Sequence, residues 1–447
     1  MNPLIENIEE LESEFFKLME KLKKDIKRQE KIMSRSDKRQ KKEYDELQKR
    51  LKEVEKLQQQ QKELLDSFIK ILAAAIDAKS PYTGGHCERV PEIAIMLAKK
   101  ANDDEKFDFK IDEKSEREIS IAAWLHDCGK VVTPEYVVDK ATKLETIYNR
   151  IHEIRTRFEV IYRDLIIESL NKKLNGEDEK EVDKWLEKEH EKLKEEFEFV
   201  AKANLGGEYM SEKERNKIKE IAKREWLRHF DKTLGLSWAE KERVKPDEKL
   251  PVTEKLLADK PEHIIKRDEN ELEEFQKYGF KIEIPKNLYN YGEIYNLTIP
   301  KGTLTKEEFF KIQEHVIMTI KMLENLPFPD DLKNVPLYAG THHEKLDGSG
   351  YPRKLKAKDL PLPSRMLAIA DIFEALTAHD RPYKTPKKLS EAIKILTFMV
   401  KDGHLDKELF KLFLKSGVYM EYAKKYLKED QIDEVDIEKY LKMLSEM

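Results

Sequence analysis

The sequence predicts an all-α fold with a long N-terminal coiled-coil helix and a largely helical insert that carries short strands. Charged residues make up 39% of the 447 residues, glycine is scarce at 15, and Lys/Glu-rich stretches alternate with Leu and Ile. This composition favours long helices. The length is too great for one ordinary domain and is enough for two or three.

The overall charge narrows the classes of partner. The chain has 85 Lys and Arg against 90 Asp and Glu, and its net charge of −5 predicts no binding to nucleic acid. No apolar run approaches the roughly 20 residues that span a bilayer, and the acidic N-terminus is unlike a signal peptide. Two cysteines are too few for a disulfide framework. We therefore expect a cytoplasmic chain without a membrane segment.

Residues 1–66 contain no glycine, and their apolar residues recur at alternating steps of three and four. This spacing predicts a coiled coil, which we expect to act as a signalling and dimerisation helix. The alternative is a lone amphipathic helix packed on its own domain, for which the apolar stripe is narrow. The apolar positions are Ile8, Leu11, Phe15, Leu18 and Leu22, followed after a polar interruption by Leu47, Leu51, Val54, Leu57 and Leu64.

Two separated segments, residues 67–139 and residues 295–390, hold every residue to which we assign chemistry. Between them, residues 140–294 form an inserted block rich in Lys, Glu and aromatic residues. Its first part, to about Ala203, predicts long helices. Its last part alternates apolar and polar residues and contains Pro, Gly and Asn between them, which predicts short strands and turns.

The chain re-enters a helix after the insert, and it ends in further helices. Thr305 and Glu308 form the pattern of a capping box, which predicts a helix that starts after Thr305. Residues 391–447 predict a C-terminal helical extension with breaks at Gly403 and Gly417.

The segment IAAWLHDCGK ends an apolar, helical run with residues suited to metal chemistry. An imidazole nitrogen next to a carboxylate suits a divalent transition metal, and the carboxylate of Asp127 can bridge two cations. Lys130 follows His126 by about one helical turn, so its ammonium can point at the same site. Gly129 permits a close approach by backbone or ligand. A single His-Asp pair is usually an ordinary core or surface feature, so the prediction depends on its companions.

Several companions lie in apolar or glycine-flanked contexts. Each one alone is better explained as a satisfied core or surface residue. A carboxylate inside an apolar helix, however, needs a partner charge or a metal. Five histidines and two aspartates together predict a metal centre, and the companions are His86, His315, His342, His343 and Asp371.

With three of its strings, the sequence resembles the HD-GYP phosphodiesterases. The strings are HHE-x-x-DG-x-GYP, from His342 to Pro352, HDCGK and DRPYK. This family is a branch of the HD superfamily of metal-dependent phosphohydrolases and hydrolyses cyclic di-GMP. The resemblance covers about residues 66–139 and 295–390. It implies an HD-type helical bundle and an enzyme that cuts cyclic di-GMP to pGpG, and on to GMP, with a hydroxide activated by a dinuclear metal centre.

The resemblance also implies the metals and their ligands. Iron or manganese is the family's usual metal, and a ligand set of N and O without thiolate agrees with it. Two divalent metals are expected per chain, because Tyr82 stands where some members have a glutamate for a third. The first metal would be held by His86, His126, Asp127 and Asp371, and the second by Asp127, His315, His342 and His343.

Five further residues are implied to meet the substrate or the reacting phosphate. Lys130 would contact the scissile phosphate and act with Asp127 in catalysis. Tyr351 would line the nucleotide pocket, and Glu374 stands where the family often has an aspartate for base recognition. Arg381 and Lys384 match a basic pair that grips the nucleotide phosphates.

The insert is the largest departure from the simplest members of the family. Because both of its ends are tethered to ligand-bearing segments, we expect residues 140–294 to cover or frame the site as a lid. The alternative is a peripheral helical elaboration. Arg150, Arg155 and Arg157 either reach the substrate phosphates or only solvate a helix face.

The implied partners are cyclic di-GMP, a second copy of the chain through the N-terminal helix, and a diguanylate cyclase. The N-terminal helix resembles the signalling helices that join sensors to output domains. Two alternative functions stay open. One is a signalling scaffold that binds cyclic dinucleotides without hydrolysis, and the other is a hydrolase for another cyclic dinucleotide such as cyclic GMP-AMP.

Overall fold

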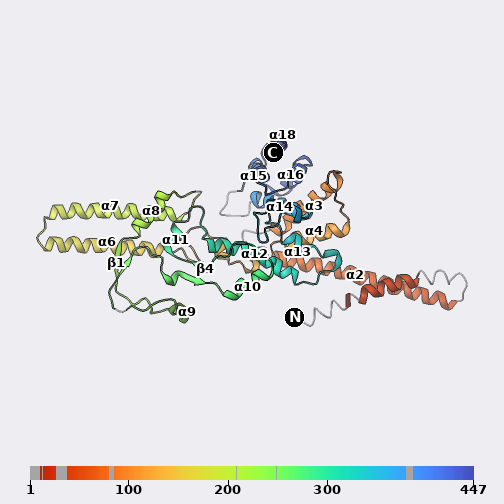
Figure 1. Ribbon diagram of the computed structural model, residues 1–447, viewed down its shortest axis with the longest axis horizontal. Helices are drawn as coiled ribbons and strands as arrows, with labels where there is room; N and C mark the ends of the chain where they lie inside the picture. The colour runs from red at the N-terminus through yellow and green to blue at the C-terminus, as the bar shows by residue number, and fades with distance from the viewer. Residues whose placement is uncertain are drawn as a thin grey trace.

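The computed structural model describes residues 11–12, 14–26, 38–79, 85–207, 209–247, 249–378 and 386–447, and Figure 1 shows their arrangement. The prediction of an all-α fold is confirmed. The strands of the described residues are four, and each has three or four residues. None of the described helices combines the length and the hydrophobicity that crossing a bilayer requires.

A helical bundle forms the centre of the molecule. Helix α3 packs against both α4 and α14, and α13 packs against α4 and α12. The helices bury apolar stripes at helical spacing, such as Val90, Ile93 and Leu97 on α3. The bundle consists of α3 (His86–Asp103), α4 (Glu113–Leu125), the 3-10 helix η1 (Cys128–Val132), α12 (Lys306–Glu324), the 3-10 helix η3 (Asp330–Leu332), α13 (Val335–Ala339), the 3-10 helix η4 (Ala357–Asp359) and α14 (Leu362–Thr377).

The start of α12 is fixed by the predicted capping box. The Thr305 hydroxyl accepts a hydrogen bond from the backbone nitrogen of Glu308, and the Glu308 carboxylate accepts one from the nitrogen of Thr305. Glu308 also forms a buried ion pair with Lys140, at 2.8 Å between Nζ and Oε2. The two ends of the insert therefore meet at the first turn of α12.

The C-terminal helices share one hydrophobic core with the bundle. Buried residues of α15, α16 and α17 cluster with those of α3 and α14. The predicted breaks are real, because Gly403 and Gly417 take the left-handed backbone conformation, with φ of 69° and 74°. The elements are α15 (Leu389–Lys401), α16 (Lys407–Lys415), α17 (Val418–Tyr426), the 3-10 helix η5 (Glu429–Gln431) and α18 (Ile437–Glu446).

The N-terminal helical segment folds back on the long helix α2 (Lys38–Lys79) instead of continuing it (Figure 1). Within the segment 11–26, the apolar residues Met19, Leu22 and Ile26 are buried. The Gln61 side chain of α2 donates a hydrogen bond to the Glu12 carboxylate at 2.9 Å. Part of the coiled-coil seam is therefore covered within one chain.

The insert has a hydrophobic cluster of its own, which includes Ile154, Phe158 and Leu193. Helices α6 and α7 form an antiparallel pair that extends away from the bundle (Figure 1). Strands β1 and β2 pair antiparallel, as do β3 and β4. The elements are α5 (Glu135–Val138), α6 (Ile151–Leu174), α7 (Glu179–Asn204), α8 (Glu212–Ile221), β1 (Glu225–Arg228), α9 (Trp238–Lys241), β2 (Val252–Lys255), the 3-10 helix η2 (Pro261–His263), β3 (Ile264–Lys266), α10 (Glu269–Lys277), β4 (Asn287–Asn290) and α11 (Glu293–Leu297).

Candidate metal centre

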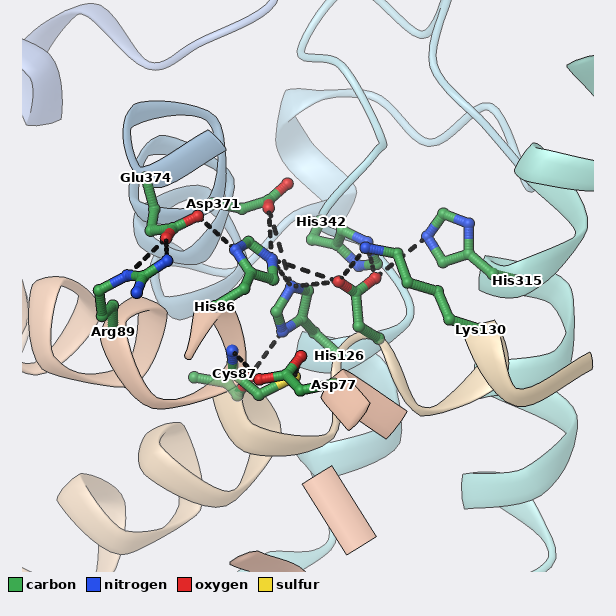
Figure 2. A network of polar contacts seen from close by, with 12 residues as sticks. Asp77, His86, Cys87, Arg89, His126, Lys130, His315, His342, Asp371 and Glu374 are labelled. Atoms are coloured by element: carbon green, nitrogen blue, oxygen red, sulfur yellow. Dashed lines mark hydrogen bonds and ion pairs between the residues drawn. The ribbon is translucent and has the colours of Figure 1, made fainter. Parts of the chain in front are cut away.

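The candidate metal ligands come from five segments that are distant in the sequence but converge in the bundle (Figure 2). Packing of α3 on α4 and α14, and of η1 on α12, brings their ligand-bearing parts together. All of these side chains are almost completely buried, apart from a partial exposure of His343. His86 begins α3, His126 and Asp127 follow α4, His315 lies within α12, His342 and His343 follow α13, and Asp371 lies within α14.

Four side chains form a first group around His86 Nε2. This nitrogen lies 3.2 Å from Asp127 Oδ2, 3.3 Å from Asp371 Oδ1 and 3.3 Å from His126 Nε2. His126 Nε2 also lies 3.3 Å from Asp127 Oδ2. Metal–ligand bonds of about 2.0–2.2 Å place neighbouring ligand atoms about 3.0–3.5 Å apart. The atoms of His86, His126 and Asp127 are therefore spaced to share one cation, and Asp371 Oδ1 lies next to two of them, 3.7 Å from His126 Nε2.

Three histidines form a second group on the other side of Asp127. Ring nitrogens of His315, His342 and His343 lie within 4.8 Å of one another. His315 Nε2 is 3.3 Å from Asp127 Oδ1, and His342 Nε2 is 4.0 Å from the same oxygen. Asp127 therefore turns Oδ2 to the first group and Oδ1 to the second.

Two ring nitrogens of the second group supply a test of whether the residues fit a metal. His315 Nε2 and His342 Nε2 are buried and have no hydrogen-bond partner in the described structure. A buried polar atom without a partner is costly, and a cation would supply the missing one. The donor set of imidazole nitrogens and carboxylate oxygens suits divalent transition metals. The residues therefore fit a divalent metal centre.

Backbone carbonyls hold three of the imidazoles in the orientation that ligation needs. In each case Nδ1–H donates to a carbonyl three residues earlier, which leaves the Nε2 lone pair facing the site. The donors His126, His315 and His342 reach Ala123 O, Ile312 O and Ala339 O at 2.7, 2.5 and 2.6 Å.

The protonation states of His315, His343 and Asp127 favour cation binding. Burial lowers the pKa of His315 to about 4 and that of His343 to about 3, so both imidazoles are neutral at pH 7. Burial opposes ionisation of Asp127, but the charge of Lys130 and the contacts with neighbouring histidines together outweigh it and hold the Asp127 pKa well below its usual range. His86 differs, because burial lowers its pKa but Glu374 and the neighbouring aspartates together raise it well above its usual value. Neutral imidazoles and ionised carboxylates are the forms that ligate metals.

Glu374 lies against His86, on the Nδ1 side of the imidazole. Its carboxylate is completely buried and accepts hydrogen bonds from His86 Nδ1 at 2.5 Å and from Arg89 Nε at 2.7 Å. Burial opposes ionisation, but His86 and then Arg89 lower the pKa of Glu374 to about 2. These partners differ from the nucleotide contact that we expected. They orient a metal-ligand candidate instead.

Lys130 lies where the sequence predicts it. Its Nζ is 2.5 Å from Asp127 Oδ2 (Figure 2). Burial lowers the pKa of Lys130, but Asp127 outweighs this effect and raises the pKa above its usual value. The ammonium is therefore charged beside the carboxylate that both groups of nitrogens share.

Gly129 and Thr319 join η1 to α12. A Cβ at Gly129 would lie 1.9 Å from the backbone oxygen of His315, so a side chain there is excluded. The Thr319 hydroxyl accepts from Gly129 N at 2.9 Å and donates to His126 O at 3.0 Å. Thr319 was not predicted from the sequence, although it lies one helical turn after His315 and therefore on the same face of α12.

The loop of the GYP string places an aromatic ring against a ligand candidate. The Tyr351 ring stacks on His343 with 4.9 Å between centroids and 21° between planes. The Glu344 carboxylate accepts hydrogen bonds from two backbone nitrogens of the same loop, at 2.7 and 2.9 Å. A Cβ at Gly350 would lie 2.3 Å from a backbone nitrogen, so this position requires glycine.

Arg381 and Lys384, the expected phosphate-binding pair, lie outside the described residues, as does Tyr82. The insert arginines have partners within the insert. Arg157 forms a two-point ion pair with Glu293, at 2.9 and 2.8 Å.

Arg150 lies over the Tyr291 ring at 5.8 Å, and Arg155 bonds to His152 at 2.8 Å. Through these contacts the three arginines hold parts of the insert together, which is neither of the two roles that we expected. They do not bring the three guanidinium groups to the ligand candidates.

The insert meets the site at the GYP loop. Lys281 N donates to Pro352 O at 2.8 Å, and Arg353 Nε donates to Tyr278 O at 3.3 Å. The Arg353 guanidinium also lies 5.6 Å above the Phe280 ring. The segment around residues 278–281 therefore contacts the loop that carries Tyr351, and the lid role expected for the insert stays a prediction.

Comparison with known proteins agrees with this geometry. Residues 83–243 match an HD domain, and residues 251–409 match an HD domain through a second family model. The chain therefore contains an HD domain, the class that its His-Asp pair and helical bundle define. The GYP string and the names of the relatives below support the resemblance of this domain to the HD-GYP type.

Several curated relatives cover part of the chain. A 3'3'-cGAMP-specific phosphodiesterase 1 of Vibrio cholerae is 36% identical over 151 residues, which are 32% of this chain and 34% of the relative. A cyclic di-GMP phosphodiesterase of Thermotoga maritima is 37% identical over 117 residues, 26% of this chain and 31% of the relative. One of Pseudomonas aeruginosa is 36% identical over 120 residues, 26% and 28% of the two chains. The match spans about a third of the relatives' length.

Proposed function

We propose that the chain is a metal-dependent phosphodiesterase that hydrolyses cyclic di-GMP to linear pGpG and on to GMP. The observation that carries the proposal is Asp127, whose two oxygens face two groups of ring nitrogens. The unbroken GYP string lies beside these groups. The names of the relatives from Thermotoga maritima and Pseudomonas aeruginosa support the substrate.

Two divalent cations, iron or manganese, are proposed per chain. When bound, such cations lower the pKa of water to generate a nucleophile and stabilise charge on the phosphate. The chain's own residues hold the arrangement. His86, His126, Asp127 and Asp371 would hold one cation, and Asp127, His315, His342 and His343 the other.

Lys130 and Tyr351 are proposed to act on the substrate directly. The Lys130 ammonium lies beside Asp127, so it would neutralise negative charge on the phosphate during the displacement. Tyr351 presents a partly buried ring next to His343 and would line the nucleotide pocket. Arg381 and Lys384 are proposed to bind the outer phosphates. For Glu374 we propose a positioning role through His86 in place of base recognition.

A second cyclic dinucleotide is a specific alternative substrate. The relative from Vibrio cholerae is named for 3'3'-cGAMP, and its identity to this chain is about equal to that of the relatives named for cyclic di-GMP. The non-hydrolytic scaffold is less well supported. All seven ligand positions and Lys130 are present, whereas a scaffold has no need to retain them.

We propose that the chain forms a homodimer through its N-terminal helices, with a diguanylate cyclase as a further partner. Exposed leucine and phenylalanine side chains remain on α2 after the segment 11–26 has folded back on it. They recur at Leu57, Leu64, Phe68 and Ile71, the spacing of a coiled-coil seam.

Chromatography of the products tests the function. Purified protein loaded with iron or manganese is incubated with cyclic di-GMP or with 3'3'-cGAMP, and pGpG is expected to form faster than the linear product of 3'3'-cGAMP. Lys130→Ala should keep the metals and lose at least about tenfold in turnover, or about 1.4 kcal/mol of barrier. Asp127→Ala should lose both metals and activity. Two bound metals without hydrolysis of either dinucleotide would establish the scaffold instead.

A further inference from the structure

The last turn of α2 reaches the first turn of the helix that carries His86. Asp77 is buried, and its carboxylate accepts from the backbone nitrogen of Cys87 at 3.2 Å and from the Cys87 thiol at 3.2 Å (Figure 2). The first backbone nitrogens of a helix lack partners within it. Gly85, at the N-cap of α3, has no side chain to supply one. A carboxylate from another helix supplies it instead.

Two residues later, Lys79 reaches the short helix that carries Lys130. Its Nζ donates to the backbone oxygens of Lys130 at 3.4 Å and Thr133 at 2.9 Å, and also to that of Val131. These oxygens lie at the C-terminal end of η1, where backbone carbonyls favour a positive charge, and that of Lys130 also accepts from Thr133 N at 3.0 Å. The ammonium of Lys79 therefore caps the turn that follows Asp127.

The second half of α2 is packed firmly on the bundle. Ile69 and Ala73 are buried, and Ile69 lies in one hydrophobic cluster with Leu125 and Cys128. Asp66 forms an ion pair with Arg117 of α4 at 2.9 Å. The part of α2 that precedes the bundle contact extends outward beside the segment 11–26, and Gln61 bonds to Glu12 there (Figure 1). A single continuous helix of 42 residues thus joins the outer hairpin to the metal centre.

We propose that Asp77 and Lys79 are positioning residues, through which α2 fixes the His86-bearing helix relative to the Lys130-bearing turn. Each residue holds one of these segments, and the two residues lie only two positions apart on α2. A rotation or shift of α2 about its axis would therefore move His86 and Lys130 together. The N-terminal helices would in this way set the geometry of the site from a distance. This inference rests on the proposed function only for its activity readout.

The test compares Lys79→Met and Asp77→Ala with the conservative variants Lys79→Arg and Asp77→Asn. Lys62→Met is the matched control, because Lys62 is an exposed lysine of the same helix. Hydrogen exchange is followed in the full-length protein with and without metal, and kcat and KM are measured with cyclic di-GMP.

Lys79→Met should speed exchange at residues 130–133 at least tenfold in both forms, and it should lower kcat at least fivefold with KM within twofold. Asp77→Ala should do the same at residues 87–89. The conservative variants should recover at least half of the lost kcat, and Lys62→Met should behave as wild type.

Three outcomes would overturn the inference. Exchange and kcat in Lys79→Met could match those of Lys62→Met, KM could rise while kcat stayed constant, or the conservative variants could fail to restore kcat. If Lys79→Met or Asp77→Ala does not fold, Lys79→Gln and Asp77→Ser are judged by the same exchange criterion. If the wild type shows no hydrolysis, the proposed function fails while the exchange experiment still decides this inference.

Discussion

Replacement of Glu374 by glutamine distinguishes two roles for this residue. The resemblance implies that Glu374 contacts the nucleotide base, whereas the structure indicates that it orients His86. In the structure, the carboxylate is completely buried between His86 and Arg89. Glu374→Gln keeps the shape and one acceptor oxygen, but it removes the charge that holds His86 with Nε2 toward the site. Loss of such an orienting partner typically costs 10–100-fold in metal affinity or activity. We therefore expect first-metal affinity to fall by that factor, or by about 1.4–2.8 kcal/mol.

The same substitution should destabilise the metal-free protein. Removing one partner of a buried ion pair costs about 3–5 kcal/mol, and because the amide remains an acceptor we expect less than about 3 kcal/mol. Metal affinity is measured by competition with a chelator, and stability by urea denaturation. Glu391→Gln is the control, since Glu391 is an exposed glutamate of α15. Unchanged metal affinity together with a raised KM for cyclic di-GMP would refute the positioning role and restore the nucleotide contact.

Three further predictions test the packing, the buried imidazoles and the N-terminal helices. Gly129→Ala places a Cβ 1.9 Å from a backbone oxygen. We therefore expect the free energy of unfolding, measured by urea denaturation, to fall by at least about 1–3 kcal/mol. The control Gly207→Ala meets open space and should lower it far less. The metal-free protein should lose stability as the pH falls from 6.5 to about 4, because in this window the unfolded chain binds a proton on His315 that the folded chain excludes. The His315 contribution is at most about 1.4 kcal/mol per pH unit, and an unchanged pH slope in His315→Asn would contradict it. Leu64→Glu combined with Phe68→Glu should convert the proposed dimer to monomer in sedimentation velocity, and an unaltered dimer would exclude that surface.

The sequence was informative wherever a local pattern has one structural meaning. The Thr305 capping box begins α12, and Gly403 and Gly417 end helices in the left-handed conformation. The structure also brings together the predicted ligand residues, which pointed to a metal centre in combination and not one by one. Lys130 likewise lies beside Asp127, which its spacing of three residues predicts.

Partners across the fold were not predictable in the same way. Glu374 and His86 are far apart in sequence, so no spacing rule could reveal that one orients the other. The contact of Asp77 was not predicted, because its partner is a backbone nitrogen at the start of α3 and the sequence pattern of side chains does not indicate such a partner. Heptad spacing in the N-terminal region specifies an apolar seam but not what covers it. The segment 11–26 covers part of that seam within the chain.

The most direct test of the central claim measures hydrolysis as a function of bound metal. Metal-free protein is titrated anaerobically with Fe²⁺ and, separately, with Mn²⁺, and bound metal per chain and the rate of pGpG formation are determined on the same samples. Because Asp127 faces both groups of nitrogens, hydrolysis of cyclic di-GMP should stay low at one equivalent and rise as the second equivalent binds. Full activity at one equivalent per chain, or none at two, would contradict a dinuclear phosphodiesterase centred on Asp127.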